Sequence, residues 1–172
     1  VHFLLTKKSR NRLPLWMHEG IAKYLESNWR GENTYLSPLM ETILSNALKT
    51  DYRVPLSAMM PSLAKLKNAK DVQLAYAEVS SMMEFLALTK GPDIFARVLQ
   101  DLASDKKFER VFMKHAGQDL NEFQNSWSRW AKKLTLKNIP GIEPLKPEFK
   151  NNQGPDAESQ SYKQLNSKKA RD

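Results

Sequence analysis

Apolar residues recur along this chain at steps of three and four, which is the period of an amphipathic helix. No stretch alternates apolar and polar positions cleanly enough to predict a strand. Proline, glycine and capping residues divide the pattern into segments. Helices are expected over residues 13–27, 37–50, 72–90, 93–103, 106–116 and 119–134, with one further turn near 56–60. The pattern therefore predicts an all-α fold, a bundle of five or six helices.

The predicted helix ends rest on local signals. Ser37 followed by Pro38 is typical of a helix start, because a hydroxyl can cap the helix and proline is tolerated at its first position. Asp119 with Glu122 three residues later resembles a capping box with Asp in place of Ser or Thr. The short apolar segment 2–5 has two interpretations, a frayed strand or the last turn of a helix that begins outside the chain.

The composition changes after residue 136. Four prolines interrupt residues 137–172, and Asn, Gln, Ser and Lys replace most apolar residues there. Such a segment buries too little apolar surface to offset the entropy lost on ordering. We therefore expect one helical domain over residues 1–136 and a polar, flexible tail over residues 137–172.

Charge and composition exclude several functions. The chain has a net charge of +8, and half of this excess lies in the first thirty residues, chiefly at Lys7, Lys8, Arg10 and Arg12. No aromatic residue is interleaved with these cations as a base-stacking surface requires, so we expect a solvated turn and no nucleic-acid partner. The chain has no cysteine, no glycine-rich phosphate loop and no apolar run of about 18 residues that would span a membrane.

The most informative stretch is Leu-Pro-Leu-Trp-Met-His-Glu-Gly-Ile-Ala at residues 13–22, followed by Tyr24. His18-Glu19 looks like the start of the zinc motif H-E-x-x-H, but Ala22 stands where the second histidine would be. The run instead resembles the glutamate-bearing helix of peptidase MA-like zinc metallopeptidases of the gluzincin group, whose pattern is roughly L-P-x-W-x-x-E-G-x-A-x-Y.

This resemblance implies a zinc site. His2 would be the second histidine of H-E-x-x-H and Glu19 the third zinc ligand, on the helix that follows. Sixteen residues separate them, enough to end one helix, cross a loop and begin an antiparallel one. The first histidine and the general-base glutamate would stand before Val1. The chain as given is thus expected to be a fragment of a longer protein or a truncated copy, inactive by itself, with weak zinc binding or none.

The resemblance extends over about residues 1–134. It includes Ala75-Tyr76-Ala77-Glu78 before a long apolar helix, the break at Gly91-Pro92 and the tryptophan helix around Trp127. A tyrosine or histidine commonly stabilises the oxyanion in gluzincins, and the resemblance assigns this role to Tyr76. The implied function is zinc-dependent hydrolysis of peptide or protein substrates, with a preference for the bacterial envelope or exterior.

Each of these residues also has an ordinary structural interpretation. Without the resemblance, Glu19 would belong to a solvated helix face and His2 would be a simple terminal histidine. His18 falls among apolar neighbours and is predicted to be a hydrogen-bonded packing residue. Tyr76, Trp127 and Trp130 would be core residues, and His115 would stabilise a helix C-terminus. The alternative function is a non-catalytic helical module that binds a partner, such as an acidic one, through the basic N-terminal loop.

Overall fold

The computed structural model describes residues 1–29, 36–60, 62–104 and 107–141. Within these ranges it contains eight α-helices, one 3₁₀ turn and no strand, which confirms the predicted all-α fold. The α-helices are α1 (His2–Ser9), α2 (Leu15–Trp29), α3 (Pro38–Lys49), α4 (Leu56–Met59), α5 (Ala69–Lys90), α6 (Ile94–Ala103), α7 (Phe108–Ala116) and α8 (Leu120–Ala131); the 3₁₀ turn η1 is Leu63–Lys65.

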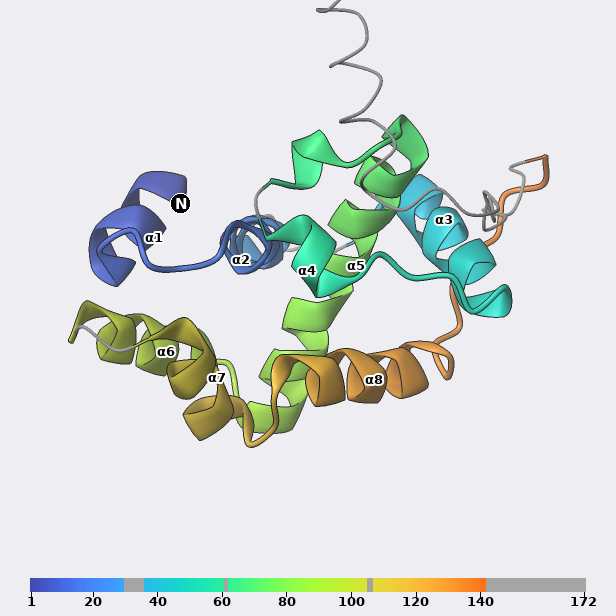
Figure 1. The fold of residues 1–172 in the computed structure, drawn as a ribbon. Coiled ribbons are helices and arrows are strands. Elements are labelled where there is room, and N and C mark those ends of the chain that lie inside the picture. Colours follow the sequence, from blue (N-terminus) through green and yellow to red (C-terminus); the bar gives the residue numbers. More distant parts are fainter. Residues whose placement is uncertain (30–35, 61, 105–106, 142–172) are drawn as a thin grey trace, which may run out of the picture.

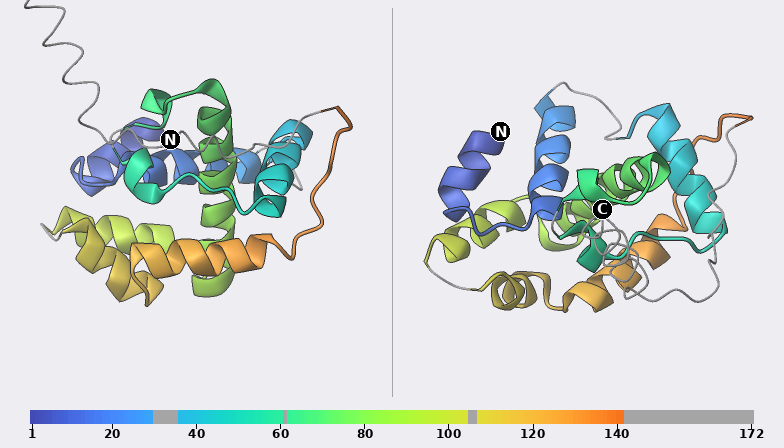
Figure 2. Two further views of the ribbon diagram at one scale, coloured as in Figure 1. Left: turned by 45° about the vertical axis from the view of Figure 1, so that its right-hand side comes forward. Right: turned by 45° about the horizontal axis from the view of Figure 1, so that its top comes forward.

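Helix α5 is the centre of the bundle (Figures 1 and 2). Helices α2, α3 and α8 pack against it, while α6 pairs with α7 and carries α1 on its other side. The core between them includes the fully buried Trp16, Trp127, Phe112 and Phe123. Trp127 is a core residue as predicted, whereas Trp130 is only half-buried, against the ring of Phe85. No described helix has the length and apolar character needed to cross a membrane.

The predicted helix ends agree closely with the structure. The Ser37 hydroxyl accepts a hydrogen bond from the Met40 amide at 3.3 Å, and Asp119 and Glu122 form a reciprocal capping box. Gly117 ends α7 with a φ of 73°, a left-handed conformation that favours glycine. Segment 2–5 is helical and not a strand, but it is not the last turn of its helix: α1 continues to Ser9, so that Lys7 and Lys8, predicted in a turn, are helical.

The chain beyond α8 runs along α3 at first. The Lys137 amide donates to Glu41 Oε2 at 2.7 Å, and the Ile139 amide donates to Thr42 Oγ1 at 3.0 Å. These bonds hold the first residues of the predicted tail against the bundle. Residues 142–172, which make up the rest of that tail, lie outside the described residues.

A buried carboxyl group fixes the connector before α4. Glu78 of α5 is fully buried and accepts hydrogen bonds from the Val54 amide through both carboxyl oxygens, at 3.3 and 3.2 Å. Burial raises the pKa of the Glu78 carboxyl well above its ordinary value. The Val54 carbonyl in turn accepts from Gln124 Nε2 at 2.8 Å, so this one residue links the connector to both α5 and α8.

The crossing of α2 over α5 depends on Gly20. A Cβ at this position would lie 2.8 Å from Met83 Cγ and 2.9 Å from the carbonyl oxygen of Val79, both on α5. Real Cβ atoms do not approach backbone oxygens so closely, so any larger residue must push the helices apart. Because Glu19 precedes Gly20 directly, this crossing also sets how deeply Glu19 lies in the bundle.

Replacing Gly20 by alanine is therefore expected to destabilise the fold. The helix would gain about 1 kcal/mol from the better propensity of alanine. Overpacking against α5 should outweigh this gain and lower the free energy of unfolding by about 1–3 kcal/mol net. Urea unfolding measures the change, with Lys23→Ala on the exposed side of α2 as a control expected within about 0.5 kcal/mol of wild type. An unchanged or higher stability of Gly20→Ala would show that the crossing adjusts freely.

Candidate metal centre

Helices α1 and α2 run side by side in opposite directions (Figure 2). The chain reverses between them at Arg10 and Asn11, which have positive φ angles of 50° and 59°. Their amides donate to the last carbonyls of α1, those of Lys7 and Thr6. This reversal returns the start of α2 beside α1, as the spacing between His2 and Glu19 predicted.

The structure brings His2 and Glu19 together. His2 Nδ1 lies 3.8 Å from Glu19 Oε1. It also lies 3.1 Å from Nδ1 of His18, and the two imidazole rings stack with their centroids 4.9 Å apart. One donor atom from each of the three side chains lies within 4.8 Å of the others. In the part of the chain that the structure describes, this is the one such group of three.

His18 was predicted to be a hydrogen-bonded packing residue, and it is indeed hydrogen-bonded. Its Nε2 lies 3.2 Å from the carbonyl oxygen of His2 and 3.2 Å from Thr6 Oγ1. What the sequence analysis missed is its position beside the other two donors. The available signal was the pair His18-Glu19 itself, which fails as an H-E-x-x-H motif but still places two donors next to each other.

Of the three donors His2 is exposed, whereas His18 and Glu19 are partly buried. The His2 side chain is 58% exposed and the Glu19 side chain 22% exposed. Beside them lies an open pocket of about 410 Å³, lined by Val1, His2, Glu19, Ala22, Lys23 and Glu26. Lys23 and Glu26 form an ion pair at 3.1 Å on its rim. A small ion and part of a larger ligand can thus reach the donors.

The donor set fits zinc. Two imidazoles and one carboxylate are ordinary Zn²⁺ ligands, bound at about 2.0–2.2 Å, so tetrahedral ligand atoms stand roughly 3.4 Å from one another. The distances from His2 Nδ1 to His18 Nδ1 and to Glu19 Oε1, 3.1 and 3.8 Å, lie on either side of that value. All three donor atoms lie within 4.8 Å of one another, so the side chains must still close around the ion.

Tyr76, the predicted oxyanion donor, lies on α5 and is half-buried against the core. Burial raises the pKa of its phenol, the negative charge of Glu19 raises it further, and the positive charge of Lys23 acts in the opposite direction. The side chain is thus close enough to Glu19 to sense its charge. It does not line the 410 Å³ pocket. Its catalytic role stays a prediction.

Two other candidates from the sequence have structural partners. His115 lies in the last turn of α7, where its Nε2 is 2.9 Å from Asp101 Oδ2. Arg12 of the basic loop donates to the carbonyl of Leu102 at 3.1 Å and so fastens the loop to α6. Arg12 therefore helps to hold the fold together, while Lys7, Lys8 and Arg10 are exposed; the alternative of a partner-binding module stays a prediction.

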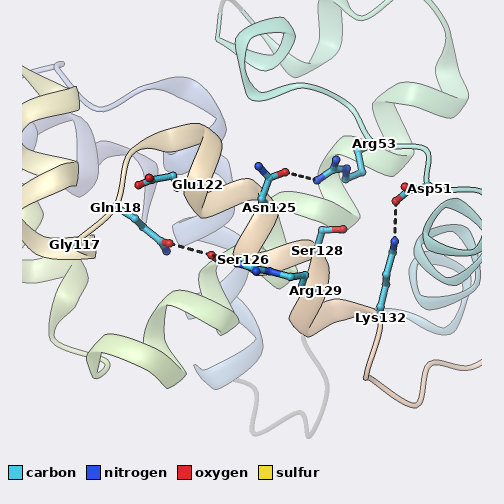
Figure 3. Close-up of a pocket in the computed structure, with 10 residues that line it drawn as sticks. All are labelled: Asp51, Arg53, Gly117, Gln118, Glu122, Asn125, Ser126, Ser128, Arg129 and Lys132. Carbon is cyan, nitrogen blue, oxygen red and sulfur yellow. Dashed lines mark hydrogen bonds and ion pairs between the residues drawn. The ribbon is translucent and has the colours of Figure 1, made fainter.

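A larger pocket of about 690 Å³ lies along α8, away from these donors (Figure 3). Its charged side chains have partners: Arg53 donates to Asn125 at 3.2 Å, and Lys132 pairs with Asp51 at 2.8 Å. The hydrogen bond from Lys132 and the positive charge of Lys132 lower the pKa of the Asp51 carboxyl group. The remaining lining residues are Gly117, Gln118, Glu122, Ser126, Ser128 and Arg129. This pocket has no histidine and offers no comparable donor set.

Comparison with known proteins gives one match. The sequence profile of the family described as "Peptidase MA superfamily" matches residues 1–133. No curated protein and no solved structure matches the chain. The matched residues include α1 to α8, and therefore the whole of the His2, His18 and Glu19 group as well as Tyr76.

Proposed function

The chain belongs to the peptidase MA superfamily, and from this premise we propose that it is part of a zinc-dependent metallopeptidase acting on peptide or protein substrates. The observation that carries the proposal is the approach of His2 Nδ1 to Glu19 Oε1, 3.8 Å apart across two antiparallel helices. These are the two residues that the resemblance assigned to zinc.

In this proposal His2 and Glu19 hold the metal beside the open pocket. A bound zinc ion would activate water at neutral pH and stabilise negative charge on the substrate carbonyl oxygen. Other residues of this chain set the positions of the two metal ligands. The crossing at Gly20 fixes the backbone that carries Glu19, and the reversal at Arg10 and Asn11 places His2 opposite it.

Tyr76 is proposed to donate a hydrogen bond to the developing oxyanion of the substrate. A donor must keep its proton at the working pH. Burial and the neighbouring Glu19 charge raise the pKa of the Tyr76 phenol, so the group is protonated at neutral pH and can act in this way. The same raised pKa disfavours Tyr76 as a general base.

The remaining parts of the site are expected before Val1. If His2 ends an H-E-x-x-H motif, a glutamate and a histidine stand three and four positions before it. This glutamate would be the general base. The proposal therefore predicts a His-Glu pair at those positions in the native protein, on a helix continuous with α1.

An extended protein that includes this upstream sequence tests the proposal. We expect peptide hydrolysis that a chelator abolishes and Zn²⁺ restores, measured with a mixed fluorogenic peptide library. Replacing the upstream glutamate by glutamine should remove the activity, whereas His115→Ala should retain it, because His115 pairs with Asp101 and is not one of the three donors. An upstream sequence without the His-Glu pair, or a zinc-loaded extended protein without hydrolysis, would contradict the proposal.

A further inference from the structure

We infer that the pocket along α8 binds an acidic peptide segment, held by the guanidinium groups of Arg53 and Arg129. This pocket of about 690 Å³ shares no lining residue with the pocket beside His2 and Glu19 (Figure 3). The inference goes beyond the proposed function and does not depend on a metal. It rests on the charges in the pocket, on a buried hydroxyl group that lines it and on its amide side chains.

Two arginines of the pocket are not bonded to any carboxylate. Arg53 donates to Asn125 Oδ1 at 3.2 Å and Arg129 donates to Ser126 Oγ at 3.2 Å, and both acceptors are neutral. Within the described ranges of the chain, neither guanidinium forms an ion pair. A guanidinium has five N–H donors in a planar fork that matches a carboxylate. Each arginine therefore has donors left for an anionic ligand.

The two carboxylates that line the pocket already have partners. Asp51 Oδ1 pairs with Lys132 Nζ at 2.8 Å, so these two charges offset each other. Glu122 Oε2 accepts from the Asp119 amide at 3.1 Å, as part of the capping box at the start of α8. With three cationic side chains and two carboxylates in its lining, the pocket has a net positive charge. This charge favours an anionic ligand over a cationic one.

Ser128 contributes a buried hydroxyl group to the pocket. The residue is only 4% exposed, yet it lines the pocket. Ser80, Ser81 and Thr89 of α5 each donate to a carbonyl one turn earlier. The Ser128 hydroxyl, in contrast, forms no hydrogen bond with any residue that the structure describes. Buried hydroxyl groups are normally hydrogen-bonded, and an oxygen atom of a bound ligand would supply the partner.

The amide side chains and the length of the pocket favour a peptide over a small anion. Arginine can only donate, so Asn125 presents its oxygen to Arg53, and its nitrogen has no acceptor among the described residues. Peptide carbonyls are suitable acceptors for such a nitrogen. The lining extends over residues 117–132 and thus along all 12 residues of α8, about 18 Å. An extended peptide of about five or six residues has this length.

Fluorescence anisotropy of residues 1–172 with two labelled, C-terminally amidated hexapeptides tests the inference. One peptide alternates glutamate and serine, and the other has glutamine in place of every glutamate. We expect the acidic peptide to bind about tenfold more tightly or better. Arg53→Gln and Arg129→Gln should each weaken its binding by about tenfold or more, because glutamine keeps a donor but loses the charge. Ser128→Ala should weaken it by about 2–10-fold, the loss of one neutral hydrogen bond.

Arg110→Gln is the matched control, because it removes the same charge from the exposed surface of α7, outside the pocket. It should bind the acidic peptide as wild type does, and circular dichroism confirms that each variant is folded. Equal losses in this control and in the pocket variants would overturn the inference, since the net charge of the chain would then explain the binding. Equal affinity for the two peptides would also overturn it, as would binding of inorganic phosphate without binding of the acidic peptide. None of these measurements involves zinc or hydrolysis, so their failure would leave the proposed function untouched.

Discussion

Replacing Glu19 by glutamine is expected to abolish zinc-dependent hydrolysis in the extended protein and to leave the helical fold intact. Glutamine has nearly the same shape, but its neutral amide is a much poorer zinc ligand than a carboxylate. Across the helix pair, His2 Nδ1 lies 3.8 Å from Glu19 Oε1. We expect zinc affinity and kcat/KM each to fall by more than about 100-fold, beyond the effect of outer-shell changes.

Glu26→Gln is the matched control for this change. It removes a carboxylate from the same helix and the same pocket, where Glu26 pairs with Lys23 at 3.1 Å on an exposed surface. Exposed ion pairs contribute little, so the control should keep its metal content and most of its activity. Metal analysis after dialysis and steady-state kinetics measure both variants. Full metal content in Glu19→Gln would remove Glu19 from the ligand set.

Replacing Tyr76 by phenylalanine should lower kcat in the extended protein by about 10²–10³-fold, the usual cost of one lost oxyanion donor. Phenylalanine retains the ring that packs against the core, so folding and zinc content should be unchanged. A pH profile of kcat provides a second check. Wild type should stay active above neutral pH until the phenol of Tyr76 ionises. This ionisation occurs above its ordinary pKa because burial and Glu19 both raise the value.

Tyr24→Phe is the control for the loss of a phenolic hydroxyl. Tyr24 lies on α2 and packs against the ring of Phe95, with centroids 5.4 Å apart. Its substitution should leave kcat within about twofold of wild type, as expected for a contact that is mainly hydrophobic. If Tyr76→Phe behaves like this control, Tyr76 is a packing residue, and another group must donate the hydrogen bond to the oxyanion.

The site could be predicted in part. The family resemblance carried by residues 13–22 implied that Glu19 and His2 share a metal; the structure places the two side chains 3.8 Å apart, and the metal itself stays a prediction. His18 was missed because a helical wheel places it among apolar residues of its own helix and says nothing of the helix packed beside it. The buried hydrogen bonds of Glu78 to Val54 were missed for the same reason, since they join residues 24 positions apart.

The sequence by itself determined most of the helices of this protein and several of their ends, but it left α1 open between a strand and a helical turn. Caps such as Ser37 and the Asp119–Glu122 box act within one helical turn, so their signal is contained in four consecutive residues. The tertiary structure decided which side chains meet. That choice depends on a reversal through two left-handed residues, Arg10 and Asn11, and on the close approach of α2 to α5 at Gly20. The reversal uses left-handed residues that are not glycine, and the close approach arises from packing between distant segments, so the apolar periodicity records neither.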